Sequence, residues 1–284
     1  MGKRDNTFIR TKTYYCGGSQ NKKAKYVEID LFPMFDAEKK KGRSAREKVT
    51  APKQKELNDK RAKRYCRLLA KANFDKGDYV LHPTYQDKYL PASIEEAEKE
   101  LKNFLRRIKR AAKKKGCDLK YIYVTEQGAV KGRVHHHLLI NSSCGLSREE
   151  IESLWSKPYR KGMSKEELAL GYINVDRLQT HDGGIDRALK YIIKYDRNVK
   201  GKRYYNASQN LRKPYESTSD EKTSKSKFAQ LVLFPEDCEE MKKHFEKANP
   251  GYELVEVTKE YNDETKSYII RAKMRLIASM RMRR

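Results

Sequence analysis

Three consecutive histidines in a strand-like stretch constrain this chain more than any other feature. His135, His136 and His137 lie within Lys131–Ile140, and three apolar residues follow them. Successive side chains of a strand point to opposite faces, so His135 and His137 share one face and His136 lies on the other. Two imidazoles side by side suit a divalent metal ion. The alternative is an exposed cluster, which the following residues disfavour because they belong in a core.

A carboxylate comes within reach of these histidines if the chain turns back on itself. Leu119–Glu126 predicts a strand, and the glycine-bearing connection Gln127–Arg133 has a length that suits a hairpin. Glu126 then ends one strand close to the point where His135 begins the next. We therefore predict Glu126 as a third metal ligand. A merely solvated glutamate is the alternative.

The charge of the chain indicates a polyanionic partner. The formal net charge is +25 at pH 7, and neutralisation of phosphates by Lys and Arg dominates affinity for nucleic acids. Nineteen tyrosines add rings on which single-stranded bases can stack. A membrane surface is the weaker alternative, because the basic stretches carry no broad apolar face.

Cysteine usage and hydropathy favour a cytoplasmic protein. The five cysteines are scattered and form no Cys-x-x-Cys pair, which favours neither a disulfide framework nor a thiolate zinc site. The first residues lack the apolar core of a signal peptide, and no stretch approaches the ~20 apolar residues that span a bilayer. We therefore expect no membrane partner.

The sequence predicts four segments. Residues 1–76 form a basic N-terminal extension with a helix at Lys55–Asn73, where apolar residues keep helical spacing. Residues 77–197 form the core, and residues 198–227 form a polar linker or loop. Residues 228–284 form a C-terminal region of strand, helix and hairpin that can pack on the core.

The core alternates strands with helices. Asp78–Tyr85 predicts a strand, in which Pro83 argues for an edge, a bulge or a strand end. Capping boxes open helices at Ser93 and Ser147, and Gly171–Asp176 predicts another strand. In the C-terminal region we predict a strand at Phe228–Phe234, a helix at Glu236–Ala248 and a hairpin of Leu254–Lys259 with Ser267–Met274.

A helix that opens near Asp182 carries residues suited to attack on a phosphodiester. Tyr191 and Tyr195 are four positions apart, so their side chains are neighbours on the helix surface. A tyrosine can serve as nucleophile when a cation and a metal stabilise the phenolate. Tyr191 is our first choice, Tyr195 the second, and Lys194 the charge partner. The alternative is that both tyrosines only pack at the edge of the core.

These residues together resemble the HUH endonucleases, specifically the rolling-circle replication initiators of small plasmids and single-stranded DNA phages. Gly77–Pro91 resembles their first motif, Glu126–Ile140 their metal motif and Ala188–Tyr195 their nucleophile motif. The resemblance covers residues 77–197. Each motif alone is weakly specific, whereas their order and spacing are specific.

The resemblance implies an α+β fold with a central antiparallel sheet and flanking helices. It implies a Mg2+ or Mn2+ ion held by His135, His137 and Glu126. It further implies that Tyr191 nicks one strand of single-stranded origin DNA, stays attached to the 5′ phosphate and frees a 3′ hydroxyl that primes synthesis. A second tyrosine allows a later cut and rejoining by strand transfer.

Two departures and the motif order refine this resemblance. His136 stands where the family usually has a bulky hydrophobic residue, so a shifted register is an alternative, and His82 with Pro83 interrupts the first motif. The candidate nucleophile follows the histidines, which favours an initiator over a conjugative relaxase, while a transposase of the same superfamily shares this order. Because the sequence has no phosphate-binding loop of the Gly-x-x-x-x-Gly-Lys-[Ser/Thr] type, a host helicase and polymerase are expected partners.

Two further functions remain open from the sequence. A non-enzymatic nucleic-acid-binding protein accounts for the charge but leaves Tyr191 and Lys194 unexplained. An RNA-processing nuclease uses similar metals and is disfavoured only by the pairing of tyrosines with the histidine strand.

Overall fold

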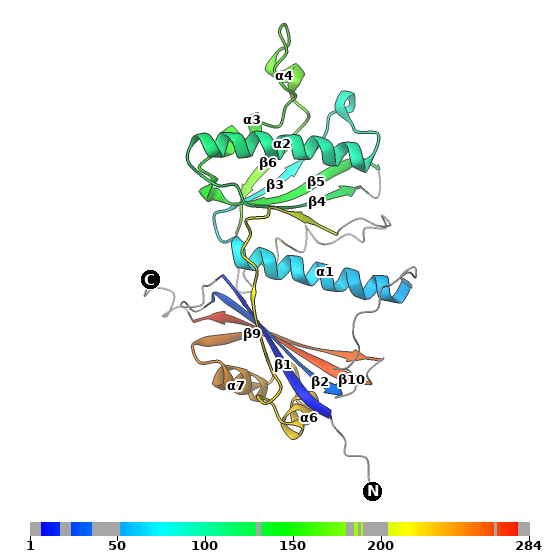
Figure 1. Cartoon of the computed structure of the whole chain (residues 1–284), viewed down its shortest axis with the longest axis vertical. Helices are drawn as coiled ribbons and strands as arrows, with labels where there is room; N and C mark the ends of the chain where they lie inside the picture. The colour runs from blue at the N-terminus through cyan, green and yellow to red at the C-terminus, as the bar shows by residue number, and fades with distance from the viewer. Residues whose placement is uncertain are drawn as a thin grey trace. The chain divides into compact units, whose positions relative to one another are not determined.

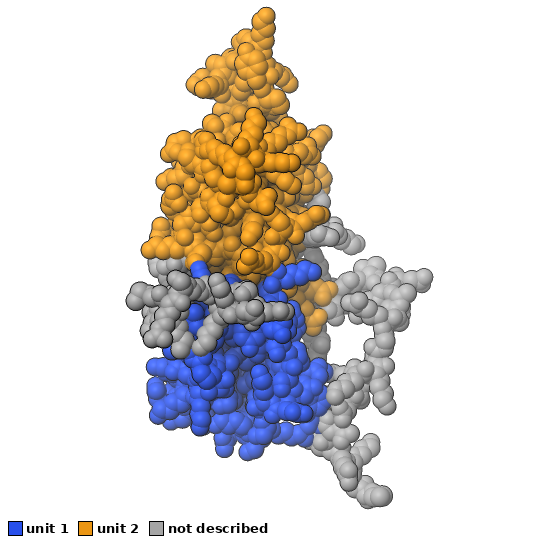
Figure 2. All heavy atoms as spheres, turned by 60° about the vertical axis from the view of Figure 1, so that its left-hand side comes forward, with its two compact units in different colours: residues 1–52, 213–284 blue, residues 53–212 orange. Residues whose placement is uncertain are grey.

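The chain folds into two compact units, which Figure 2 distinguishes by colour. The computed structural model describes residues 7–17, 24–35, 52–128, 132–179, 185–186, 189, 204–263 and 266–277. Unit 1 comprises Met1–Pro52 with Lys213–Arg284, and unit 2 comprises Lys53–Arg212. Unit 1 is thus built from both ends of the chain, and unit 2 from the segment between them.

Unit 2 is a five-stranded antiparallel sheet with a long helix on each face (Figure 1). The strand order is β6-β3-β5-β4-β7. Its strands are β3 (Tyr79–Pro83), β4 (Tyr121–Gln127), β5 (Val134–Ile140), β6 (Ile173–Arg177) and β7 (Asn206–Ala207). Its α-helices are α1 (Pro52–Asn73), α2 (Ile94–Lys114), α3 (Arg148–Ser153) and α4 (Lys165–Leu168), and 3-10 turns lie at Asp87–Tyr89 and Ser142–Cys144.

The helix α2 forms because its start and its buried face are both encoded locally. The Ser93 side chain accepts a hydrogen bond from the backbone N–H of Glu96, and Glu95 and Glu96 lie in the first turn, near the positive end of the helix dipole. The residues that α2 buries keep helical spacing. They are Ala97, Leu101, Phe104, Leu105, Ile108 and Ala112.

Each face of the unit 2 sheet has its own apolar cluster. On the α2 side, Leu101 and Phe104 belong to one cluster with Leu138 of β5. On the other side, Cys66 of α1 belongs to a second cluster with Leu139 of β5. Neighbouring residues of one strand therefore serve opposite cores, as side-chain alternation requires.

Unit 1 is a second five-stranded antiparallel sheet, in the order β8-β1-β2-β10-β9, with two helices against one face (Figure 1). Alternate residues of β2, Val27, Ile29 and Leu31, pack with Phe228 and Phe245 of the helices. Its elements are β1 (Thr7–Cys16), β2 (Tyr26–Phe35), β8 (Tyr215–Ser219), α6 (Lys225–Leu233), α7 (Glu239–Ala248), β9 (Tyr252–Asn262) and β10 (Ser267–Leu276).

The predicted fold class is confirmed: the chain is α+β, its sheets are antiparallel, and helices flank them. The helix predicted at Lys55–Asn73 is α1, and the predicted C-terminal hairpin is formed by β9 and β10. The Ser147 capping box is present with both of its hydrogen bonds. Within the helices that the structure describes, none combines the length and the apolar character needed to cross a bilayer.

The strand predicted at Phe228–Phe234 is wrong, because this stretch lies largely in helix α6. The Ser224 side chain caps that helix by accepting from the backbone N–H of Lys227. Phe228 and Leu231 are three positions apart and are both buried, which is a helical spacing. A short apolar run cannot be assigned to strand or buried helix by periodicity alone.

The segment expected as an N-terminal extension contributes strands β1 and β2 to unit 1, and the segment expected as a linker contributes β7 and β8. These strands pair with residues far away in the chain. β2 lies between β1 and β10, so its central place in the sheet depends on a hairpin more than 200 positions later in the sequence.

Candidate metal centre

Two neighbouring strands carry the candidate metal centre. β4 and β5 pair so that Glu126 lies opposite His135 and Val124 lies opposite His137. Directly opposed residues of an antiparallel pair project to the same face, and so do alternate residues of one strand. Glu126, His135 and His137 therefore share one face of the sheet.

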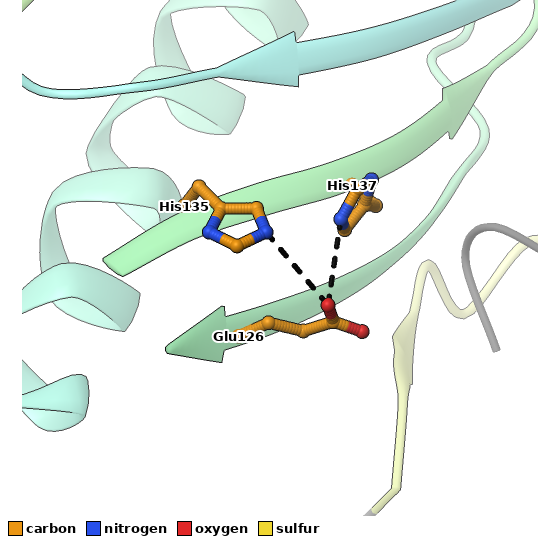
Figure 3. Close-up of side chains that lie close together, drawn as sticks. All are labelled: Glu126, His135 and His137. Carbon is orange, nitrogen blue, oxygen red and sulfur yellow. Dashed lines mark ion pairs between the residues drawn. The ribbon is translucent and has the colours of Figure 1, made fainter. Parts of the chain in front are cut away.

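The three side chains converge on one point (Figure 3). Nε2 of His135 lies 3.8 Å, and Nε2 of His137 3.5 Å, from Oε2 of Glu126. One ligand atom from each residue lies within 4.8 Å of the other two. The Glu126 side chain is 3% exposed and that of His135 is 28% exposed. The group is thus closed on its carboxylate side and accessible beside His135.

Hydrogen bonds turn the Nε2 lone pairs of both histidines toward Glu126. Nδ1 of His135 lies 3.3 Å from the carbonyl oxygen of Arg133, which can only accept, so this Nδ1 carries the hydrogen and Nε2 keeps its lone pair. Nδ1 of His137 lies 2.8 Å from Nδ1 of His82. With the hydrogen on Nδ1 of His137, its Nε2 also presents a lone pair.

His82 of β3 is a hydrogen-bond partner of His137 that the sequence analysis did not predict. Burial lowers the pKa of His82, the neighbouring His137 lowers it further, and Asp176 acts in the opposite direction. A neutral His82 can accept the hydrogen from His137, and such a partner orients a metal-binding imidazole. The sequence signal for this contact is a histidine in an apolar strand, at the point where the first motif is interrupted.

The donor set fits a divalent cation. Both carboxylate oxygens of Glu126 and Nε2 of His137 are buried, and none of these atoms has a hydrogen-bond partner among the residues that the structure describes. Buried acceptors left unsatisfied are destabilising, and a cation among them would satisfy all three. Imidazole and carboxylate ligands bind several divalent metals, so the residues could hold a metal ion without fixing which one.

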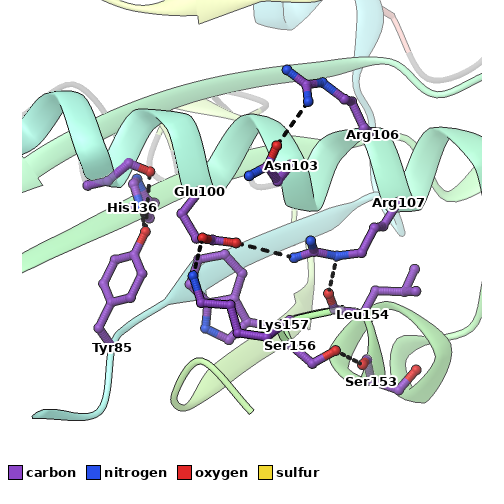
Figure 4. Close-up of polar contacts among 12 residues, drawn as sticks. Tyr85, Glu100, Asn103, Arg106, Arg107, His136, Ser153, Leu154, Ser156 and Lys157 are labelled. Atoms are coloured by element: carbon purple, nitrogen blue, oxygen red, sulfur yellow. Dashed lines mark hydrogen bonds and ion pairs between the residues drawn. The ribbon is translucent and has the colours of Figure 1, made fainter. Parts of the chain in front are cut away.

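His136 has different surroundings from its two neighbours (Figure 4). Its ring is 0% exposed and lies on the α2 side of the sheet. Nδ1 is 2.9 Å from Oγ1 of Thr125, and Nε2 is 2.7 Å from the hydroxyl of Tyr85. Trp155 packs against the same ring. The predicted alternation of the three histidines is present in β5, and the shifted register is not.

The predicted nucleophile region lies largely outside the described residues. Ile185, Asp186 and Leu189 are described, and the backbone N–H of Leu189 donates to the carbonyl of Ile185 as in one helical turn. Asp186 forms an ion pair of 2.9 Å with Lys71 of α1. The residues that the structure leaves undescribed include Tyr191, Lys194 and Tyr195.

The described residues of this region pack on the sheet face that carries the triad. Ile185 and Leu189 are buried in the same cluster as Val124 and Leu139. Val124 lies directly opposite His137, so this cluster occupies the same face as Glu126 and both metal-type histidines. Tyr191 follows Leu189 by two residues, a span of at most about 7 Å.

Residues 78–200 match the family model of the replication-associated protein ORF2/G2P. The match covers less than half of the chain, lies in unit 2, and includes the triad. The predicted resemblance to replication initiators is confirmed at the level of this replication-associated family, and the match is consistent with a rolling-circle initiator. No curated protein and no solved structure matches the chain significantly.

Proposed function

We propose that this chain is a replication initiator that cuts one DNA strand at an origin by attack of Tyr191 on a phosphodiester. Glu126, His135 and His137 would hold Mg2+ or Mn2+ beside the scissile phosphate. A bound ion of this kind polarises a non-bridging phosphate oxygen and stabilises the developing negative charge. The proposal rests on the replication-associated family match, which spans both the triad and the tyrosines.

The packing of two residues that precede Tyr191 in the sequence also supports this proposal. Ile185 and Leu189 are buried in the cluster on the triad's face of the sheet. They anchor the segment that runs into Tyr191, which supports an approach of the phenol to the triad. Tyr195, four positions later in the sequence, would serve as the second nucleophile that strand transfer requires.

The chemistry proposed for the protein residues is one in-line displacement. The phenol oxygen of Tyr191 forms a bond to phosphorus, and the bond from phosphorus to the 3′ oxygen breaks. The phenol gives up its proton to solvent, and the leaving 3′ oxygen takes up a proton from solvent and becomes the hydroxyl that a host polymerase extends. Lys194 would stabilise the phenolate before the attack. Attack by a second strand's 3′ hydroxyl reverses the displacement and joins the ends.

A covalent adduct tests this function directly. Single-stranded oligonucleotides tiled across the replicon that encodes the chain, labelled at their 3′ ends, should yield a labelled protein band with Mg2+ or Mn2+ and none with a chelator. Tyr191→Phe, alone or with Tyr195→Phe, should abolish the band. Tyr159→Phe is the matched control, because Tyr159 is an 81% exposed tyrosine of unit 2 outside the proposed site.

Other outcomes point to the rival functions. An adduct that persists in the Tyr191→Phe, Tyr195→Phe double variant contradicts the proposal. DNA binding without a metal and without strand scission indicates a non-enzymatic binding protein, and cleavage of RNA without an adduct indicates a processing nuclease. Integration of the bound strand into a second DNA indicates a transposase.

His137→Ala should lose cleavage while keeping most of the salt-sensitive DNA binding.

A further inference from the structure

The outer face of helix α2 carries a row of cations without acids between them. From Leu101 to Lys114 the helix contains no Asp or Glu. We call the five cations that line up along this part of the helix the basic stripe. They are Lys102, Arg106, Lys109, Arg110 and Lys113.

The geometry of the helix places the stripe on one rigid, exposed face. With 3.6 residues per turn, the five positions fall within an arc of roughly 100° and extend over about 17 Å. Lys102 and Lys113, at the two ends, are both exposed, while Leu101, Phe104 and Ile108 on the opposite face are fully buried. The stripe therefore holds its shape because the apolar face of α2 is packed against the sheet.

The cations of the stripe differ from two neighbouring cations, Arg107 and Lys157, which are paired with an acid. Arg107 and Lys157 both contact Glu100, and Arg107 also donates to the carbonyl of Leu154. In Figure 4 these contacts lie on one side of α2, and Arg106 leaves the helix on another. Across the described part of the chain, no carboxylate lies within ion-pair distance of a stripe residue; Arg106 contacts only the neutral Asn103 side chain.

Like charges at this spacing repel one another. Helix positions three or four apart place side chains about 5–6 Å from each other, which is within the Debye length of about 8 Å at physiological ionic strength. A run of unpaired cations is therefore destabilising on its own, and a polyanion that binds it relieves the repulsion. One strand of duplex DNA offers one phosphate charge per about 3.4 Å of the helix axis, and five cations over about 17 Å have a similar average spacing.

We propose that the basic stripe binds the backbone of double-stranded DNA, as a second contact separate from the candidate metal centre. This proposal rests on the proposed function, since it supplies the duplex that flanks the nicked strand. The two surfaces lie on opposite sides of the unit 2 sheet: α2 packs with Leu138, whereas His135 and His137 project to the other face.

The composition of the stripe distinguishes duplex DNA from other anionic partners. Single-strand binding uses aromatic rings on which bases stack, and the one aromatic residue of α2, Phe104, is fully buried. Insertion into a membrane surface needs an apolar flank beside the cations, and the large apolar residues along the length of the stripe, Phe104, Leu105 and Ile108, are buried in the core. Phosphate contacts alone require neither feature.

The test compares two variants of the full-length chain with equal loss of charge. The stripe variant carries Lys102→Gln, Arg106→Gln, Lys109→Gln and Lys113→Gln. Glutamine keeps the helix propensity of the exposed positions, so the fold is retained. The control variant carries Lys222→Gln, Lys242→Gln, Lys243→Gln and Lys247→Gln, four exposed lysines of unit 1.

Binding of a 30-base-pair duplex of arbitrary sequence is measured against NaCl concentration. Each lost phosphate contact should reduce the magnitude of the slope of log K against log salt by about 0.9. With four substitutions, the magnitude of the slope should be smaller in the stripe variant by up to about 3.6. Its affinity near 100 mM salt should fall by at least about 10-fold, while the control variant should change by less than about 2-fold. Its Mn2+ affinity and adduct yield on a single-stranded oligonucleotide should remain unchanged.

Three results with duplex DNA overturn the stripe proposal: equal losses in both variants, an unchanged slope in the stripe variant, or no duplex binding by the unaltered protein at low salt. Stripe-dependent binding to vesicles of 30% phosphatidylserine in phosphatidylcholine, without a matching loss of duplex binding, overturns it in favour of a membrane surface. Failure of the proposed nicking is recognised separately, because the adduct is then missing from the unaltered protein while the duplex comparison still holds.

Discussion

At the scale of single residues, three adjacent histidines have two different surroundings. His135 and His137 project toward Glu126. Among the described residues, Nε2 of His137 has no hydrogen-bond partner, and one ligand atom from each of the three side chains lies within 4.8 Å of the other two. His136 projects to the other side, where both of its ring nitrogens have hydroxyl partners. The alternation of side chains along one strand is enough to give the histidines these different surroundings.

This separation predicts opposite effects for two histidine substitutions. His136→Leu should destabilise the protein by about 1–3 kcal/mol, because it removes the hydrogen bonds between a buried imidazole and the hydroxyls of Thr125 and Tyr85, while the folded protein still binds Mn2+. His135→Leu, at a partly exposed position, should lose Mn2+ binding with a much smaller change in stability. Urea unfolding and Mn2+ titration of both variants check this. Equal destabilisation by the two substitutions would contradict the assignment.

A second residue-scale prediction concerns His82. Its contact with Nδ1 of His137 fixes the ring that presents Nε2 to the metal, so His82→Ala should weaken Mn2+ affinity by roughly 10- to 100-fold. His82→Asn, which can accept the same hydrogen through its amide oxygen, should recover part of that loss. His244→Ala is the matched control, since His244 is a half-buried histidine of α7 in unit 1. Unchanged affinity in His82→Ala would remove His82 from the site.

At the scale of helices and strands, the sequence predicted what local periodicity determines. Helices α1 and α2 follow from apolar spacing, and α2 also from its Ser93 cap. The pairing of β4 with β5 follows from the short connection after Gln127. Long-range pairing has no local signal: β1 and β2 carry the alternation of strands, but only the distant β8 and β10 complete their sheet.

The candidate metal centre was likewise predictable from the sequence only where local geometry brings its residues together. Glu126, His135 and His137 lie on two strands joined by one hairpin, so local geometry brings them together. His82 reaches His137 from β3, the strand on the other side of β5. That contact depends on strand order, which a single sequence does not fix.

Cys66 provides a test of how α1 packs in unit 2. Its thiol is fully buried beneath the sheet, and burial raises its pKa to about 12. Because the thiolate is the reactive form, Cys66 should react with iodoacetamide at pH 8 at least about 100-fold more slowly than an ordinary exposed cysteine. Cys117 and Cys238, which are partly exposed, are the internal references. Peptide mass spectrometry after timed labelling gives the rates, and labelling of Cys66 at the rate of Cys117 would contradict the packing.

At the scale of the whole molecule, the chain combines a continuous unit with a discontinuous one. Unit 2 has apolar clusters on both faces of its sheet and a single run of chain. The described residues of unit 1 form an apolar cluster that draws on both ends of the chain, with Ile29 and Ile270 among its members. The family match lies in unit 2, so the matched region and the surrounding fold can be separated experimentally.

The two units should therefore differ in their ability to fold when they are expressed as separate fragments. A fragment of residues 53–212 should unfold cooperatively in urea and bind Mn2+ within about 2-fold of the full chain, because a domain of this size can bury a core of its own. A fragment of residues 213–284 should show no cooperative transition, since β10 loses β2 and β8 loses β1, and an unpaired sheet edge with an exposed apolar face is unstable in water. Adding a peptide of residues 7–35 should restore a transition, whereas a scrambled peptide of the same composition should not. Cooperative unfolding of the 213–284 fragment alone would show that unit 1 does not need its N-terminal strands.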